Sequence, residues 1–148
     1  MRKIAILIVT LLVSSFSVDI ANSQTELAPL PPNYRAQIVQ VISKRYDLTQ
    51  IRDAGITPPV KKCGLFLCNH WMFCVATVAD FKFGDRLFGG GLTYSVISVW
   101  FNNGQAEVLG STMVNGRGSA TNKRLNVGGC GGKVTSPFPE IVRGKPLS

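Results

Sequence analysis

Residues 92–114, LTYSVISVWFNNGQAEVLGSTMV, contain the clearest fold signal in the chain. The Asn103-Gly104 pair tolerates the positive φ angles that a tight hairpin turn requires. The residues before it are mostly β-branched or aromatic, which is typical of a strand. We therefore expect residues 92–101 and 105–114 to form two antiparallel strands joined by this turn.

The first strand of this hairpin is largely apolar on both faces. Because successive side chains point to opposite sides of a strand, one face carries Tyr94, Val96, Ser98 and Trp100, and the other carries Thr93, Ser95, Ile97, Val99 and Phe101. Two apolar faces are typical of a central strand with a helix on one side.

Residues 34–46, YRAQIVQVISKRY, can supply that helix. Tyr34, Ile38 and Ile42 recur at four-residue steps, with polar residues on the other faces. Asn33 is a suitable residue to precede the first turn. The pattern predicts an amphipathic helix of about three turns that packs on the sheet.

The remaining segments set the expected limits of the domain. Gly55 and the Pro58-Pro59 pair favour an ordered connection over residues 47–62. Residues 65–83 form a further strand in this interpretation, and one short edge strand lies near residues 124–127. We expect one α+β domain over residues 33–135, with an N-terminal helix packed on a three- to four-stranded antiparallel sheet. A glycine-rich C-terminal loop and a flexible tail, residues 136–148, follow it.

The N-terminus predicts export. Arg2 and Lys3 precede an apolar run, and Ala21-Asn22-Ser23 places small residues where a signal peptidase cleaves. Cleavage would leave a chain of 125 residues that begins at Gln24, with residues 24–32 as an extended leader. The apolar run is shorter than the roughly 20 residues that cross a bilayer, so a retained anchor is the less favoured alternative. We expect a protein of the periplasm or cell envelope.

Composition favours an anionic partner. The net charge is +8, and removal of residues 1–23 lowers it to +7, because two basic residues and one acidic residue leave with them. A basic exported protein is attracted to phospholipid head groups, lipopolysaccharide or acidic glycans. We therefore expect peripheral contact with an anionic envelope component or an acidic protein, and no nucleic acid as partner in vivo.

Three of the four cysteines lie in residues 61–75, KKCGLFLCNHWMFCV. On a strand, Cys68, His70, Met72 and Cys74 share one face, which would suit copper or, less well, zinc. A strand rises about 3.3 Å per residue, so Cys68 and Cys74 would lie about 20 Å apart and could not share one ion. A soft-metal site is therefore the alternative function, and no cofactor is expected.

Export favours disulfides over free thiols, because an oxidising compartment pairs cysteines. Cys130 lies in GGCGG, whose glycines let the backbone approach a partner strand closely. We favour the pairs Cys63–Cys68 and Cys74–Cys130. A turn near Cys68 would instead bring Cys63 opposite Cys74, and free buried thiols are a further alternative.

Catalytic signals are weak. Cys68 and His70 share a strand face, but their backbones lie about 6 to 7 Å apart, and a histidine in an apolar run is more often a core residue than a general base. The glycine-rich residues 84–91 lack the Lys-Ser/Thr ending of a phosphate-binding loop. We therefore expect a binding or structural protein and no enzyme.

The expected contact residues are basic or near the helix start. They are Arg117, Lys123 and Arg124 in the C-terminal segment, with Tyr34 and Arg35 on the helix. Arg52 and Asp53 are interpreted as a local ion pair.

Four segments in order, LPPNYRAQIVQVI, IRDAGITPP, WMFCVATVADFKFG and WFNNGQAEV, together resemble a group of small exported proteins of Gram-negative bacteria. In that group a Tyr-Arg helix is followed by an Ile-Arg-Asp-Ala segment and a strand with Cys-Val. Residues 76–80 depart from the group, whose members carry an Asn-rich segment there. The resemblance implies an exported α+β domain and adds no catalytic residue.

Overall fold

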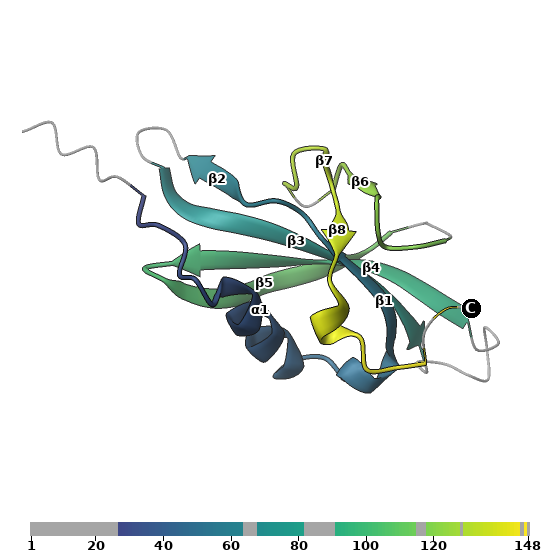
Figure 1. Ribbon diagram of the computed structural model, residues 1–148. Helices are drawn as coiled ribbons and strands as arrows, with labels where there is room; N and C mark the ends of the chain where they lie inside the picture. The colour runs from purple at the N-terminus through teal and green to yellow at the C-terminus, as the bar shows by residue number, and fades with distance from the viewer. Residues whose placement is uncertain are drawn as a thin grey trace, which may run out of the picture.

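The computed structural model describes residues 27–63, 68–81, 91–114, 118–127, 129–145 and 147. A helix lies along one side of a twisted antiparallel sheet, and the segment after the last long strand covers part of the other side (Figure 1). The C-terminal end of the chain then returns to the helix side. The elements are α1 (Tyr34–Ser43), η1 (Leu48–Gln50), β1 (Ile51–Ile56), β2 (Val60–Cys63), β3 (Cys68–Phe81), β4 (Gly91–Asn102), β5 (Gln105–Met113), β6 (Arg124–Leu125), β7 (Lys133–Val134), β8 (Ser136–Pro137) and η2 (Pro139–Ile141).

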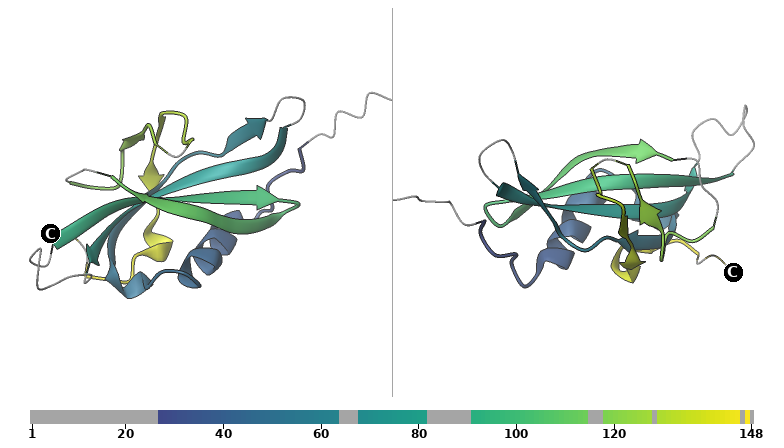
Figure 2. Two further views of the ribbon diagram at one scale, coloured as in Figure 1. Left: turned by 180° about the vertical axis from the view of Figure 1, so that it is seen from behind. Right: turned by 90° about the horizontal axis from the view of Figure 1, so that it is seen from above.

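The main sheet has six strands in the order β5-β4-β3-β1-β8, with β2 also paired to β3. β6 and β7 form a separate two-stranded sheet over one face of it, as Figure 2 shows. The α+β class is confirmed, but the expected three to four strands are too few. The reason is that β1, β2 and β8 extend the sheet from segments with glycines and prolines, which have no strong strand pattern of their own.

The hairpin of β4 and β5 is as predicted. Asn103 and Gly104, at the two central turn positions, have φ angles of 49° and 76°, which is the backbone conformation of a type I′ turn. β4 pairs with β3 along eleven residues, from Trp71 opposite Phe101 to Phe81 opposite Gly91. Together β3 and β4 form the centre of the sheet.

Both faces of β3 and β4 are covered, and by different parts of the chain. On one face Phe73, Val75, Ile97 and Val99 pack with Ile38 and Ile42 of the helix. On the other, Met72, Cys74, Ala76, Tyr94 and Val96 pack under Ala120, Leu125 and Cys130. The predicted alternation is therefore confirmed for both strands. Residues 118–127 and 129–135 cover the face opposite the helix, and we call them the C-terminal cover.

The connection predicted for residues 47–62 is wrong in detail, because it contains two strands. β1 and β2 follow one another along the same edge of β3, with Ile56 opposite Val75 and Val60 opposite Met72. Between them Thr57 exchanges two hydrogen bonds with Cys74, from backbone N–H to carbonyl at 2.9 Å and from Cys74 N–H to Thr57 Oγ1 at 3.0 Å. The Pro58-Pro59 pair breaks the ladder there and does not end the sheet.

The predicted flexible tail is also wrong for residues 136–141. β8 pairs with the edge of β1, and the side chains of Phe138 and Ile141 are fully buried against the helix side of the sheet. Arg35 holds this segment to the helix: its Nε donates to Glu140 Oε1 at 2.6 Å and its Nη2 to Oε2 at 2.9 Å. Phe138 and Ile141 were not predicted as core residues, because the prolines and glycines around them interrupt any periodic apolar pattern.

Gly55 allows the C-terminal cover to approach β1 closely. A Cβ atom at this position would overlap the carbonyl oxygen of Ala120 and lie 2.8 Å from Thr135 Cβ. We expect Gly55→Ala to lower the free energy of unfolding by about 2 kcal/mol, because the core would be overpacked. Gly110→Ala is the control, since a Cβ atom there meets nothing within 4 Å. Equal denaturant midpoints for the two variants would contradict the close approach.

Phe138 tests whether the C-terminal segment belongs to the core. Phe138→Ala should lower the free energy of unfolding by about 3 kcal/mol or more, the usual cost of removing a buried ring. Lys145→Ala, at an exposed position, should change it by less than about 0.5 kcal/mol. Denaturant unfolding of both variants with the disulfides intact measures the difference. If Phe138→Ala is as stable as the unmodified protein, the interpretation of this segment as a flexible tail would be correct.

Candidate functional site

A groove of about 520 Å³ lies on the sheet face that carries the C-terminal cover, in the part that the cover leaves open. Its volume falls within the range of small-ligand sites, roughly 300 to 1,000 Å³. The groove crosses from β2 and β3 over β4 to β5. It is lined by Lys62, Cys63, His70, Met72, Ser98, Trp100, Leu109, Gly110, Ser111, Thr112 and Gly129.

Two stacked aromatic rings line this groove. Trp100 of β4 lies opposite Met72 of β3, which places His70 diagonally beside it. The ring centroids of His70 and Trp100 are 3.9 Å apart and the planes are inclined by 13°. The indole Nε1 of Trp100 is buried and has no acceptor among the described residues. A buried donor without an acceptor costs about 1 to 3 kcal/mol.

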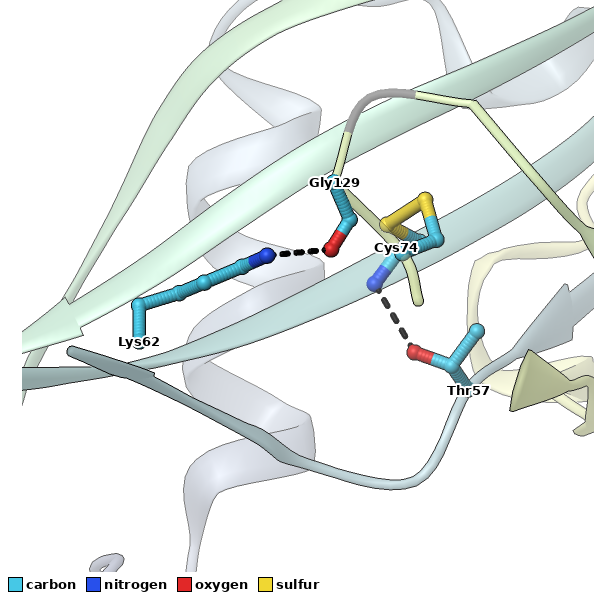
Figure 3. The surroundings of a disulfide bond; sticks show 5 residues. Thr57, Lys62, Cys74 and Gly129 are labelled. Atoms are coloured by element: carbon cyan, nitrogen blue, oxygen red, sulfur yellow. Dashed lines mark hydrogen bonds between the residues drawn. A yellow bond between two sulfur atoms is a disulfide. The ribbon is translucent and has the colours of Figure 1, made fainter. Parts of the chain in front are cut away.

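The two sides of the groove come from β5 and from the C-terminal cover. On β5 a bulge inserts Leu109 between the pairs Ser98–Gly110 and Val99–Val108, so this strand bends at the groove. On the other side Lys62 Nζ donates to the carbonyl oxygen of Gly129 at 2.5 Å. Figure 3 shows this bond next to the disulfide, which holds the loop of Gly129 over β3.

The predicted disulfide between Cys74 and Cys130 is present. The Cα atoms are 5.8 Å apart, and both residues are buried. Cys63 is disulfide-bonded as well, and its backbone lies opposite that of Cys68. The side chain of Cys68 lies outside the described part of the structure, so the pair Cys63–Cys68 stays a prediction.

The same bond removes Cys74 from the alternative soft-metal site. Cys74 cannot act as a thiolate ligand while it is joined to Cys130, and His70 is stacked on Trp100. Within the described ranges no group of three or more His, Cys, Asp or Glu side chains could hold a metal ion. Of the row Cys68, His70, Met72 and Cys74, only His70 and Met72 line the groove with described side chains.

The predicted contact residues on the helix have structural partners. The ring of Tyr34 stacks on Phe73 with centroids 5.1 Å apart. The guanidinium of Arg35 lies 4.7 Å from the ring centre of Phe138 and forms the bidentate pair with Glu140. The bond to Arg35 holds the pKa of Glu140 below its usual value, while the same bond raises the pKa of Arg35. A role in binding stays untested for both residues.

Two of the three predicted contact residues of the C-terminal segment, Lys123 and Arg124, lie on the cover. Lys123 Nζ lies 4.6 Å above the ring of Tyr94, and Arg124 Nη1 donates to the carbonyl oxygen of Gly132 at 2.8 Å. Arg117 lies outside the described residues. The structure adds two cations on this side, Lys62 of β2 and Lys133 of β7. The sequence did not indicate them, because their positions depend on the pairing of β2 with β3 and of β6 with β7.

Arg52 and Asp53 do not form the local pair that we expected. Arg52 Nε lies 2.7 Å from a carboxylate oxygen of Asp80, on the next strand. Asp53 Oδ2 accepts hydrogen bonds from Ser119 Oγ and from the backbone N–H of Ala120, both at 2.6 Å. Both side chains therefore join β1 to other segments, because neighbouring residues of a strand point in opposite directions.

A smaller pocket of about 160 Å³ lies on the opposite face, next to η1. Tyr46, Gln50, Thr77, Asp80, Thr93 and Ser95 supply most of its polar lining. The hydroxyls of Thr77 and Ser95 bond each other at 2.8 Å, and Asp80 is paired with Arg52. Thr77, Ser95 and Asp80 therefore have partners within the protein, which favours a structural role for this pocket.

Comparisons with protein-family models, with curated proteins and with solved structures return no match for this chain. The resemblance to small exported proteins of Gram-negative bacteria stays a prediction. Among the described residues no helix is long and apolar enough to cross a membrane.

The titration of Tyr94, which is buried under the C-terminal cover, makes the stability of the fold depend on pH. Burial, and secondly the charge of Asp53, raise the pKa of Tyr94 from 10.0 to about 12. Between these values the unfolded chain loses the phenolic proton and the folded chain keeps it, so unfolding becomes more favourable as pH rises. We expect the free energy of unfolding to fall by about 2 kcal/mol over this interval.

Denaturant unfolding at pH 10 and pH 12, with the tyrosinate absorbance followed in parallel, measures this effect. Tyr94→Phe is the matched variant, because it keeps the buried ring and removes the titrating group. The loss of stability should be smaller in Tyr94→Phe. An identical pH dependence in both proteins would assign the loss to other groups.

Proposed function

We propose that this protein is an exported, non-enzymatic binding protein that contacts an anionic component of the cell envelope through its C-terminal cover. The observation that carries the proposal is the charge of this layer. Residues 118–135 contain Lys123, Arg124 and Lys133 and no acidic residue, and Lys62 reaches the same layer from β2. Four cations in one region attract anions more strongly than the same charges dispersed over the surface.

One carboxylate, that of Asp53, lies against this region. Asp53 is occupied by two hydrogen bonds from Ser119 and Ala120, which fix the cover on β1. Arg124 and Lys133 are exposed, so their charges are available to a partner in solution. The region is therefore basic in the assembled fold as well as in composition.

Export is supported by the buried disulfide. A bond between Cys74 and Cys130 persists in an oxidising compartment and is rare in the cytosol. A non-enzymatic role is supported by the state of the chemically reactive groups: Cys74 is in the disulfide and His70 is stacked on Trp100. An acidic protein is the rival partner, and it would meet the same basic surface.

Binding to anionic probes at two salt concentrations tests the proposal. The probes are vesicles that contain phosphatidylglycerol and a soluble polyuronate. We expect binding to at least one of them, and at least tenfold weaker binding at 0.5 M than at 0.05 M salt, because salt screens surface charges. If neither probe binds and an acidic protein is captured instead, the proposed envelope component is wrong and the acidic protein is the partner.

Two double variants with the same change in net charge provide the control. Arg124→Gln with Lys133→Gln removes two cations from the C-terminal cover. Lys44→Gln with Arg45→Gln removes two exposed cations just after the helix. We expect the first pair to weaken binding about tenfold and the second to weaken it less than threefold. Equal losses would mean that net charge alone attracts the probe.

A further inference from the structure

We propose that the groove beside the C-terminal cover binds an acidic polysaccharide, with sugar rings against Trp100 and His70 and a carboxylate near Lys62. The inference rests on the proposed function, which requires an anionic partner, and it names the chemical class of that partner. It depends on three properties of the lining: stacked rings, hydroxyl groups and a single cation.

The stacked rings favour a ligand with apolar faces. His70 and Trp100 present a rigid pair of rings to the groove, and Met72 and Leu109 add apolar surface on either side. Aromatic rings contribute large contact areas at a small cost in conformational entropy. The C–H faces of a pyranose ring can lie against such a surface, while its hydroxyl groups remain free at the ring edge.

The hydroxyl groups of the groove exclude a purely apolar ligand. Ser98, Ser111 and Thr112 lie along one side, next to the backbone of Gly110. A serine or threonine hydroxyl both donates and accepts a hydrogen bond, and the hydroxyls of a sugar do the same. An acyl chain would leave these hydroxyl groups without partners, which is unfavourable in a desolvated site.

The charge of the groove selects among oxygen-rich ligands. Lys62 uses one of its three ammonium protons for Gly129, and the remaining protons can bind a carboxylate. Among the residues that the structure describes, the lining of the groove contains no other Lys, Arg, Asp or Glu. Glu107, which lies opposite Trp100 on β5, disfavours an anionic group directly beside Trp100 and favours the uncharged face of a sugar ring there. A glycan with spaced carboxylates fits this distribution better than a single-stranded nucleic acid, whose backbone requires a continuous basic track.

Trp100 supplies a direct measurement. The chain has two tryptophans, and Trp71 points to the opposite face, where its Nε1 donates to the carbonyl oxygen of Ala28 at 2.9 Å. In Trp71→Phe the fluorescence therefore reports Trp100 alone, and in Trp100→Phe it reports Trp71 alone. We expect a hexamer of galacturonic acid to change the emission of the first variant and not that of the second.

Selectivity is tested with four ligands on the Trp71→Phe protein. The galacturonate hexamer should bind at least tenfold more tightly than maltohexaose, a neutral glycan of equal length. It should also bind more tightly than a thymidine hexanucleotide or vesicles that contain phosphatidylglycerol. A preference for the oligonucleotide, or a change of Trp100 emission with vesicles only, would overturn the glycan inference and leave an anionic partner for the protein.

The place of binding is tested with variants of the groove, by calorimetry with the galacturonate hexamer. Trp100→Ala and Lys62→Met should each weaken binding at least tenfold. Gly110→Phe should do so too, because a side chain can enter there without overlap and would fill the groove from β5. Gly110→Ala should bind within twofold of the unmodified protein. Thermal unfolding of each variant verifies that the fold is retained.

The outcomes separate the two proposals. Tight binding of the hexamer that is lost in Gly110→Phe and kept in Gly110→Ala supports the groove. Binding that is unchanged in Gly110→Phe and Trp100→Ala overturns the groove and leaves the basic surface as the site. Failure of the hexamer and the vesicles to bind at any salt concentration overturns the proposed function and this inference together.

Discussion

The structure depends on one constraint: β3 and β4, the two central strands, are apolar on both faces. Each face must be removed from water by another part of the chain. The N-terminal helix covers one face with Ile38 and Ile42, and the last third of the chain covers part of the other with Ala120, Leu125 and Cys130. The sheet is therefore the middle layer of three, and the groove lies where the third layer ends.

The third layer contains few apolar residues and is held mainly by specific bonds. The disulfide between Cys74 and Cys130 closes a loop of 56 residues, which in the chain-entropy model contributes about 4 kcal/mol. Asp53 binds the start of the cover, and Thr135 Oγ1 donates to the carbonyl oxygen of Ala120 at 2.6 Å. Gly55 lets both segments approach β1. These contacts replace the apolar area that a short glycine-rich segment cannot bury.

This way of fixing the cover also shapes the candidate site. The disulfide and the bond from Lys62 hold the loop of Gly129 at one side of the groove, while the bulge on β5 shapes the other. A ligand would thus meet rigid walls, and little ordering cost would oppose binding. The bond that stabilises the cover through Gly129 also fixes the ammonium group of Lys62 at the groove.

The local features of the fold follow from the order of the amino acids alone. Asn103-Gly104 specified the hairpin turn, alternation assigned the faces of β3 and β4, and the four-residue steps from Tyr34 placed the helix. Such features depend on neighbours in the chain, so they can be read from short windows. The pairing of Cys74 with Cys130 was also predictable, because GGCGG marked a loop able to approach a strand.

The remaining features depend on contacts between distant parts of the chain. Phe138 and Ile141 lie among prolines and glycines, so no periodic pattern marked them as buried. The stacking of His70 on Trp100 and the reach of Lys62 to Gly129 join residues 30 and 67 positions apart. Such contacts depend on strand register and on the path of the cover, and neither is encoded within a short window of sequence.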